Sequence, residues 1–386
     1  MEFRDLKRQY QMLKPKIDRA MQDVAAAGNY IMGDPVKALE QRLAEYVGVK
    51  HCMSCANGTD ALTLALKALG IGKGDAVFVP DFTFFASAEV VALEGATPVF
   101  VDVHPQTFNI DSASLQEAIN NVMQEGRLHP KAIIAVDLFG LPADFSALRP
   151  IAEQHNLYLI EDGAQGFGGR QERIAGKRAC GFADIGTTSF FPAKPLGCYG
   201  DGGAVFTDND EWAELIRSLR VHGKGSNKYD NVRIGMNSRL DTVQAAILNV
   251  KLDAFIDHEL DAVNTAAAAY TRLIGKASGN VQVIPPSIPE GFLSSWAQYT
   301  LRLSYPEQDV LQRREALQAR LKANGIPSMV YYPIPMSLQT AFKETPRYAP
   351  TPHAQYLAHS VLSLPMHPYL TNEEISFVVE SLMASL

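Results

Sequence analysis

The sequence lacks several features that mark specialised classes of protein. Its 386 residues include only four cysteines, too few for the disulfide framework of a small secreted domain. Cys52 and Cys55 have C-x-x-C spacing, but no second such pair and no close pair of histidines completes a zinc site. We therefore expect no metal site, and we expect these two cysteines to be small buried side chains on a strand.

Long apolar runs and strong positive charge are also missing. The most apolar stretch, Val77–Val103, is interrupted by four carboxylates, so we expect no membrane span. The N-terminus is charged from its second residue and has no apolar signal-peptide core. The formal net charge is −7 and the pI is about 5.7, which is unlike the basic footprint of a nucleic-acid-binding protein. These absences predict a cytoplasmic protein that binds neither nucleic acid nor membranes.

Several familiar catalytic motifs are absent. No G-x-G-x-x-G follows a strand, and no G-x-x-x-x-G-K-[ST] occurs, so neither a dinucleotide fingerprint nor a P-loop is present. The sequence contains no H-E-x-x-H and no G-x-S-x-G. A metalloprotease and a serine hydrolase of the nucleophile-elbow type are therefore disfavoured.

Short apolar runs alternate with helical patterns between about residues 50 and 220. The alternation predicts an α/β protein with a largely parallel sheet covered on both faces, and ligands in such sheets bind at the carboxyl ends of the strands. The expected strands are 51–54, 76–79, 98–101, 133–136 and 157–160, and the expected helices are 58–69, 83–93, 112–122 and 145–155.

The pattern changes after residue 220. A polar, glycine-rich loop comes first and a long helical stretch follows, then short strand-like and helical pieces. We expect a large domain over residues 1–240 and a smaller α+β domain, which begins with the long helix, over residues 241–386. The segments involved are the loop 221–228, the helices 240–273, 307–323 and 371–386, and the strands 298–303 and 329–332.

Two short segments place polar side chains at the expected ligand-binding edge. Asn57-Gly58-Thr59-Asp60 joins a strand to a helix. Its backbone amides and hydroxyl suit an anion, although the same residues can simply cap the helix. Asp162 and Gln165 follow another strand. A carboxylate there can pair with a protonated ring nitrogen, or it can be a solvated turn residue.

Two further segments supply the remaining candidate cofactor-binding residues. Phe84 follows a third strand, and its ring can lie on a planar cofactor or belong to the core. Ser189 can bind phosphate, and Lys194 lies in a kinked stretch between apolar runs. A lysine partly removed from water has a lowered pKa and a free amine, as a Schiff-base lysine requires. An anion cradle, an aromatic face, an acid and a lysine together predict pyridoxal phosphate as the cofactor.

Five motifs, in this order along the chain, resemble the DegT/DnrJ/EryC1/StrS family of sugar aminotransferases. The resemblance covers nearly the whole chain. It implies a pyridoxal-phosphate enzyme of fold type I, with a large cofactor-binding domain and a smaller C-terminal domain. The motifs are residues 56–62, 161–165, 189–194, 199–204 and 237–241.

The resemblance implies roles for residues that would contact the cofactor ring. Lys194 would form the Schiff base and move protons during catalysis. Asp162 would pair with the pyridine nitrogen, and Gln165 would lie near the phenolic oxygen. Phe84 would stack on the ring.

The resemblance also implies a shared site in a homodimer. Gly58, Thr59 and Ser189 would hold the cofactor phosphate, and Asn237 would reach the phosphate bound by the neighbouring subunit.

Of the residues that the resemblance assigns to the substrate, one lies within these motifs and three lie outside them. They are Tyr30, Arg239, Tyr331 and Tyr332. The position of Tyr331 is often His in the family, so the resemblance leaves the role of this tyrosine open.

Within the family, residues 194–199 and 363–367 resemble enzymes that act on UDP-2-acetamido-2-deoxy-3-oxo-glucuronate for lipopolysaccharide O-antigen. The expected amino donor is L-glutamate and the expected acceptor a UDP-sugar. The alternatives are a 4-keto-6-deoxy UDP- or dTDP-sugar as acceptor, and a non-catalytic regulator that only binds the cofactor. A 3-dehydratase of the same fold is disfavoured, because such members have histidine where this chain has Lys194.

Overall fold

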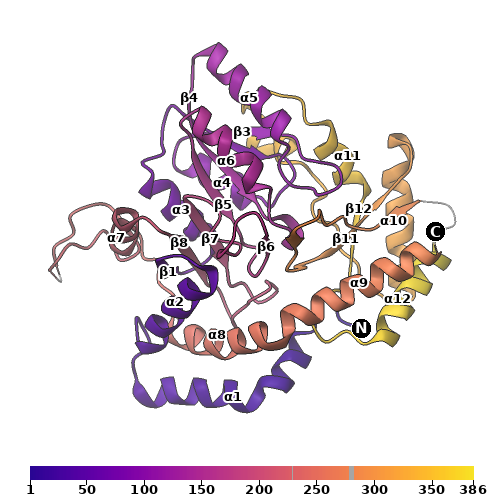
Figure 1. Ribbon diagram of the computed structural model, residues 1–386, viewed down its shortest axis with the longest axis horizontal. Helices are drawn as coiled ribbons and strands as arrows, with labels where there is room; N and C mark the ends of the chain where they lie inside the picture. The colour runs from indigo at the N-terminus through magenta and orange to yellow at the C-terminus, as the bar shows by residue number, and fades with distance from the viewer. Residues whose placement is uncertain (228, 278–281) are drawn as a thin grey trace.

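The structure is a computed structural model that describes residues 1–227, 229–277 and 282–386 (Figure 1). Within these ranges no helix is long and apolar enough to cross a membrane.

A seven-stranded, mostly parallel sheet forms the centre of the molecule. Its strand order is β1-β8-β7-β5-β4-β2-β3. The pairs from β7 to β3 are parallel, whereas β8 runs antiparallel to both β7 and β1. The expectation of an α/β fold with a largely parallel sheet is confirmed. The strands are β1 (His51–Cys55), β2 (Asp75–Pro80), β3 (Thr97–Val101), β4 (His129–Val136), β5 (Tyr158–Asp162), β7 (Ile185–Ser189) and β8 (Gly203–Thr207).

Helices cover both faces of this sheet, because alternate residues of its strands point to opposite sides. Val77 and Val79 of β2 join one buried cluster with residues of α3. Ala76 and Phe78 of the same strand join another with residues of α5 and α6. All five strands and all four helices predicted between residues 50 and 160 are present. The helices are α3 (Gly58–Ala68), α4 (Ala86–Leu93), α5 (Ser112–Glu125) and α6 (Phe145–Gln154), and α7 (Asp210–Leu219) follows β8.

In Figure 1 the small sheet and the C-terminal helices lie to the right of the central sheet, and the N-terminal helices lie below it. The predicted long helix is present as α8 (Thr242–Ala254) and α9 (Leu260–Ala277), joined by the π-helical turn η2 (Phe255–Glu259). The N-terminal α1 (Leu6–Ala27) packs along α8. The small antiparallel sheet has the order β12-β11-β9. Other elements are α2 (Asp34–Val47), β9 (Val283–Ile284), β11 (Tyr299–Leu303), α10 (Glu307–Ala323), α11 (Pro352–Ser360), β12 (Val361–Leu364) and α12 (Asn372–Ala384).

Short elements connect these layers. They are η1 (Leu138–Gly140), the two-stranded pair β6 (Arg170–Gln171) and β10 (Phe292–Leu293), η3 (Met336–Leu338) and η4 (Thr340–Phe342). The division into domains at residue 240 stays a prediction.

Two predicted segments differ from the structure. The helix expected from residue 83 begins at Ala86, and residues 83–85 form a loop after β2. The strand expected over 329–332 is wrong: only Met329 forms a bridge, with Ser363. Pro333 and Pro335 follow directly, and a proline has no N–H with which to continue a strand.

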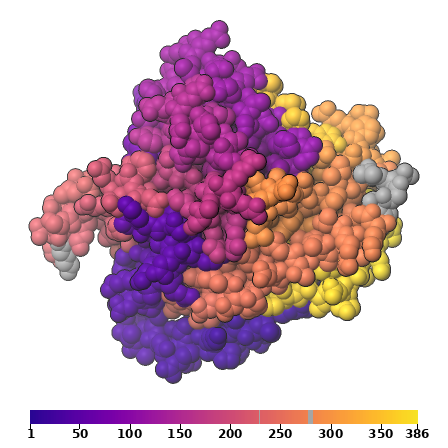
Figure 2. Space-filling view, viewed as in Figure 1, coloured from indigo at the N-terminus to yellow at the C-terminus, as the bar shows by residue number. Residues whose placement is uncertain are grey.

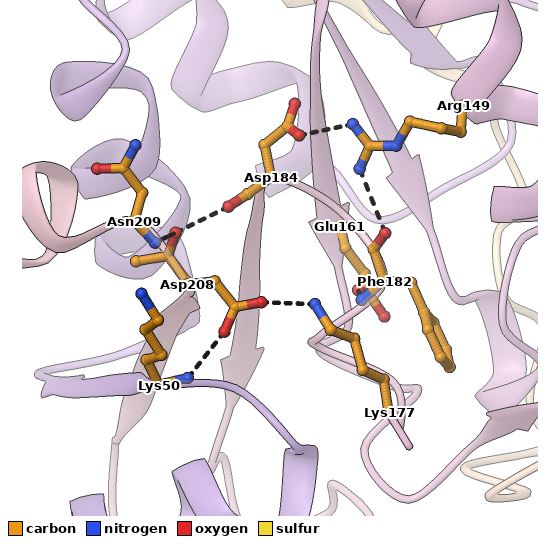
Figure 3. A network of polar contacts seen from close by, with 9 residues as sticks. Lys50, Arg149, Glu161, Lys177, Phe182, Asp184, Asp208 and Asn209 are labelled. Carbon is orange, nitrogen blue, oxygen red and sulfur yellow. Dashed lines mark hydrogen bonds and ion pairs between the residues drawn. The ribbon is translucent and has the colours of Figure 1, made fainter. Parts of the chain in front are cut away.

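A polar network fixes the edge of the sheet where β5 and β7 begin and β8 ends (Figure 3). Asp184 accepts hydrogen bonds from Leu159 N at 2.8 Å and Arg149 Nη1 at 2.6 Å. Asp208 bonds to Lys50 N at 2.9 Å and Lys177 Nζ at 2.7 Å. Asp162 and Ser189 are the last residues of β5 and β7. The polar network lies at the other end of these two strands.

A glycine-rich segment projects from the body of the molecule next to α7 (Figures 1 and 2). We call the described residues 221–227 and 229–235 the arm. Bridges between Val221 and Asn237 and between Lys224 and Asn231 hold its two sides together. The arm exposes large apolar side chains, with Ile234 94% exposed and Tyr229 87% exposed.

Candidate active site

A cavity of about 650 Å³ opens where β4, β5 and β7 end. Most of the residues predicted to contact the cofactor line it, together with two of the three tyrosines predicted to contact the substrate. The site residues that it brings together are Gly58, Thr59, Phe84, Asp162, Gln165, Ser189, Lys194, Tyr331 and Tyr332.

The start of α3 forms a cradle for an anion. Asn57 caps the helix by accepting a hydrogen bond from Asp60 N at 2.8 Å. The amides of Gly58 and Thr59 have no acceptor among the described residues. A Cβ on Gly58 would lie 2.7 Å from Ser189 Cβ, so only glycine lets the helix start approach β7 this closely. Free amides at a helix N-terminus, beside a hydroxyl, suit a phosphate.

Asp162 is a buried carboxyl at the end of β5, with only 5% of its surface exposed. Ser87 Oγ donates to its Oδ2 at 2.7 Å, and Ala164 N donates to its Oδ1 at 3.2 Å. Burial raises the pKa of Asp162, while these two bonds and the Lys194 amine oppose the rise. A cationic ring nitrogen would stabilise this carboxylate further, because an opposite charge at short range favours the ionised form.

Lys194 lies in the irregular segment that follows β7. Its amide donates to Phe191 O at 2.8 Å, which closes a turn, and its side chain lines the cavity. Burial lowers the pKa of the Lys194 amine, the nearby Arg4 lowers it further, and Asp162 raises it. A lysine with a lowered pKa has the free amine that attack on a carbonyl requires.

Aromatic rings and an amide form the wall of the cavity. Phe84 is 52% exposed, and its ring lies 6.0 Å from that of Tyr332. Gln165 donates from Nε2 to the Tyr332 hydroxyl at 3.0 Å and accepts from Phe139 N at 2.7 Å. Burial is the main cause that raises the pKa of the Tyr332 hydroxyl. Tyr332 therefore stays neutral at ordinary pH and can donate a hydrogen bond.

Three predicted site residues do not line this cavity. Tyr30 is 53% exposed and its backbone carbonyl accepts from Thr242 N at 2.9 Å. Asn237 lies at the foot of the arm, where it is exposed, and Arg239 follows it. All three lie on or near the segment 237–242, away from the residues that surround Lys194. Their roles stay predictions, since a neighbouring subunit is needed to test them.

Three neighbours of the site were not predicted from the sequence. Ser87 donates to Asp162 and lies on α4, and Gln298 contributes to the cavity wall just before β11. Arg4 donates to the carbonyl of Lys194 at 2.8 Å. Ser87 is the closest of these to a predicted segment, because it follows Phe84 by three residues. Gln298 and Arg4 lie far from the cofactor motifs in sequence, and no local sequence pattern indicates that they belong to the site.

The cysteine prediction is confirmed. Cys52 and Cys55 are both buried on β1. Burial raises the pKa of both thiols, to about 12 for Cys55, so neither is a reactive thiolate near neutral pH.

The polar groups around the cavity fit pyridoxal phosphate. In the part of the chain that the structure describes, the amides of Gly58 and Thr59 lack acceptors, and the buried Asp162 lacks a cationic partner in contact with it. The Lys194 side chain makes no hydrogen bond among the described residues and lines the same cavity. An anion, a cationic ring nitrogen and a carbonyl would satisfy these three groups, and pyridoxal phosphate carries all three.

Comparisons with known proteins point to one family. The DegT/DnrJ/EryC1/StrS aminotransferase family matches residues 11–383. The chain is 45% identical to UDP-2-acetamido-2-deoxy-3-oxo-D-glucuronate aminotransferase of Pseudomonas aeruginosa, over 99% of both chains. It is also 43% identical to a protein of Geobacillus stearothermophilus named pleiotropic regulatory protein, over 98% of this chain and 96% of that one.

Solved structures agree with the family and with the cofactor. A DegT DnrJ EryC1 StrS aminotransferase from Brucella abortus has a TM-score of 0.93 and 46% identity, covering 100% of this chain and 99% of that one. The Bacillus subtilis protein ntda, solved with the cofactor PMP bound, has a TM-score of 0.85 and 28% identity, covering 97% of this chain and 82% of that one. The chain thus belongs to the DegT/DnrJ/EryC1/StrS family and is a pyridoxal-phosphate-dependent sugar aminotransferase of fold type I.

Proposed function

We propose that this sugar aminotransferase transfers the amino group of L-glutamate to the C3 ketone of UDP-2-acetamido-2-deoxy-3-oxo-glucuronate. The observation that carries the proposal is the 45% identity, over 99% of both chains, to the Pseudomonas aeruginosa enzyme named for that substrate. The product would be a 3-amino sugar, for use in a surface polysaccharide such as O-antigen.

In this proposal Lys194 is the catalytic base and acid. Its buried amine, with a lowered pKa, accepts a proton from the carbon that bears the donor nitrogen and returns a proton in the second half of the reaction. When bound, pyridoxal phosphate supplies an electron-withdrawing ring that stabilises negative charge on that carbon. Asp162 holds a proton on the ring nitrogen, and Ser87 keeps the carboxylate oriented through its 2.7 Å hydrogen bond.

The other walls of the cavity position the two ligands. Gly58, Thr59 and Ser189 would hold the phosphate group, and Phe84 would stack on the ring. Tyr331 and Tyr332 line the same cavity, and we assign them to the sugar. Among the described residues that line the cavity, Lys194 is the sole cation. A sugar carboxylate would therefore need a cation from elsewhere, and we assign Arg239 of a second subunit to it.

This assignment makes the working enzyme a homodimer with shared sites. Tyr30, Asn237 and Arg239 lie outside the cavity of their own chain, and the apolar side chains of the adjacent arm are exposed. In the dimer, Asn237 reaches the phosphate of the neighbouring site, and Tyr30 and Arg239 contact the sugar. Exposed apolar surface of this kind marks an interface.

The first test is the visible spectrum of the purified protein. A yellow protein that bleaches with L-glutamate has completed the donor half-reaction. The bleached protein is then mixed with the 3-oxo UDP-uronate and, separately, with 4-keto-6-deoxy UDP- and dTDP-sugars. We expect the yellow colour to return with the 3-oxo substrate. Return only with a 4-keto sugar would reassign the acceptor.

The regulator alternative has one specific observation in its favour, the name of the Geobacillus stearothermophilus relative. It predicts bound cofactor whose spectrum no amino donor changes. The complete set of Lys194, Asp162 and Ser189 around one cavity favours turnover instead.

Replacing the catalytic amine gives the second test. We expect Lys194→Ala to lower kcat by at least about 10⁴-fold, because this variant removes the group that moves the proton. Steady-state rates with L-glutamate and the 3-oxo sugar measure the loss. The phosphate cradle is intact in this variant, so it retains the cofactor non-covalently. A near-wild-type rate would rule out the role proposed for Lys194.

A further inference from the structure

The N-terminal segment reaches the back of the lysine loop, which we define as residues 190–198. Arg4 Nη2 donates to Lys194 O at 2.8 Å and approaches Pro195 O at 3.4 Å. Next to it, the Phe3 carbonyl accepts from Met366 N at 3.1 Å, and the Phe3 ring lies edge-on to that of Tyr331 at 6.2 Å. One short segment therefore touches both the lysine loop and the wall of the cavity.

The lysine loop has few other restraints near Lys194. Its internal bonds are Lys194 N to Phe191 O and Cys198 N to Phe190 O, both 2.8 Å. Among the described residues, Arg4 is the one side chain that donates to the Lys194 carbonyl. The backbone from which the catalytic side chain extends is thus fixed from outside the loop, by a residue 190 positions away in sequence.

Charged groups surround Arg4 on several sides. Burial lowers the pKa of its guanidinium to about 10, while Glu259 and Tyr369 raise it, so Arg4 keeps its charge near neutral pH. Lys251 and His367 also lie within its electrostatic reach. Burial lowers the pKa of His367 to about 4, which leaves that imidazole neutral. The charge of Arg4 therefore persists across the pH range in which an aminotransferase works.

The same charge acts on the Lys194 amine. Two charged groups face this amine: Asp162, which favours its protonated form, and Arg4, which disfavours it. A like charge at short range destabilises an ammonium group. Arg4 thus adds to the effect of burial and offsets part of the effect of Asp162.

We propose that Arg4 is a positioning residue for Lys194. Its guanidinium fixes the carbonyl at the centre of the lysine loop and places a positive charge beside the lysine amine, which favours the neutral, proton-accepting amine. The proposal rests on the catalytic role proposed above for Lys194.

The test uses the full-length holoenzyme and three variants. Arg4→Gln removes the charge but retains a donor, and Arg4→Lys retains the charge but loses the planar fork that spans two carbonyls. Arg8→Gln is the matched control, because Arg8 belongs to the same segment and bonds to Glu374 at 3.0 Å without touching the lysine loop. Thermal unfolding confirms that each variant is folded.

The main readout is the visible absorbance of the bound cofactor as a function of pH, which reports protonation of the Lys194 nitrogen. We expect Arg4→Gln to raise the midpoint of this titration by about 0.5 to 1 pH unit, as removal of a nearby like charge does. Arg4→Lys should return the midpoint toward the wild-type value, and Arg8→Gln should leave it unchanged. We also expect kcat of Arg4→Gln to fall roughly tenfold with little change in KM, because the lysine is less well oriented.

An unchanged midpoint in Arg4→Gln would overturn the proposal, and so would an equal shift in Arg8→Gln, which would assign the effect to tethering of the segment.

Failure of the proposed function would give different results. In that case Lys194→Ala would retain its activity or the wild-type protein would remain colourless. If Arg4→Gln does not fold, the Arg4→Lys titration decides: a wild-type midpoint with reduced kcat supports the proposal, and a midpoint shifted upward contradicts it.

Discussion

Gly58 faces Ser189 across the cradle at the start of α3, and the distance between them leaves no room for a methyl group. A Cβ at this position would lie 2.7 Å from Ser189 Cβ and 3.2 Å from Ser189 Oγ. We expect Gly58→Ala to weaken cofactor binding tenfold to about a hundredfold, equivalent to about 1–3 kcal/mol of overpacking. Titration of the cofactor-free protein with pyridoxal phosphate measures the change.

Gly72→Ala is the control for this substitution. The nearest heavy atom to a Cβ at Gly72 is 3.6 Å away, which is ordinary van der Waals contact. Its cofactor affinity should equal that of the wild type. An equal loss of affinity in both variants would show that the cradle is not specific to Gly58.

Asp137 is a fully buried carboxyl behind the site, beside the equally buried Glu161. Ala143 N donates to its Oδ1 at 3.0 Å, and Oδ2 has no hydrogen-bond partner among the described residues. Both oxygens of Glu161 accept from backbone amides, of Cys180 and Phe182. Burial, together with the neighbouring Glu161 carboxylate, raises the pKa of Asp137 well above its usual value of 3.8, and burial raises the pKa of Glu161 to about 7. Asp137 therefore holds its proton to a higher pH than an ordinary carboxyl does.

These shifts make the free energy of unfolding depend on pH. The folded state retains protons that the unfolded chain releases above its ordinary carboxyl pKa values of 3.8 and 4.5. The stability of the protein therefore falls as pH rises from about 4.5 to 7, by up to a few kcal/mol. In Asp137→Asn a neutral amide replaces the titrating acid, so we expect a flatter dependence between pH 5 and pH 8. Urea unfolding at pH 5 and at pH 8 measures this dependence.

Asp144→Asn provides the comparison for this prediction. Asp144 caps α6 by accepting from Ala147 N at 3.1 Å, and asparagine caps a helix equally well. Its pH dependence should match that of the wild type. A wild-type slope in Asp137→Asn as well would contradict the assignment of the buried proton.

At the scale of the elements, the network of Figure 3 holds β5, β7 and β8 in register at the edge away from the cavity. Removing Asp184 would leave Leu159 N of β5 without its acceptor and would break the pair with Arg149. We expect Asp184→Ala to lower the free energy of unfolding by about 2–3 kcal/mol, chiefly from the unpaired backbone amide. The kcat should change little, because the substitution lies at the start of β7 and the cavity at its end.

Lys177→Ala serves as the control at the same edge. The Lys177–Asp208 pair is more exposed, with side chains 30% and 45% accessible, and exposed pairs contribute less than about 1 kcal/mol. If Lys177→Ala and Asp184→Ala lost the same stability in urea unfolding, the amide of Leu159 would not be the main contributor.

Particular elements show which parts of the fold and of the site can be predicted from the sequence alone. The strands and helices between residues 50 and 160 could be predicted because alternation of apolar runs follows directly from burial on two faces. The segment 329–332 could not, since Tyr331 and Tyr332 line the cavity and the prolines that follow prevent pairing. Lys194 and Asp162 lie in motifs, whereas Arg4 reaches the lysine through a contact between distant segments, which no local pattern encodes.

At the scale of the whole molecule, the cavity of one chain includes most, but not all, of the residues proposed to contact the cofactor and the substrate. Tyr30, Asn237 and Arg239 lie beside the base of the arm, and the cavity is lined without them. A second copy whose arm region covers this cavity would bury the exposed Ile234 and bring the three residues to the sugar and the phosphate. The proposed dimer thus gives a function both to the three residues that lie outside the cavity and to the exposed apolar surface of the arm.

Mixed dimers test this arrangement. Lys194→Ala and Asn237→Ala disable different parts of the shared site, so a dimer of one chain of each has one site with both wild-type residues. After subunit exchange of two inactive variants we expect activity to recover to about a quarter of the wild-type value, because half of the dimers are mixed and each has one intact site. Lys194→Ala mixed with Asp162→Asn should recover nothing, since both residues line the cavity of a single chain. No recovery in the first mixture despite exchange would show that Asn237 serves its own chain. Recovery in the second mixture would show that Lys194 and Asp162 of one chain do not act in the same site.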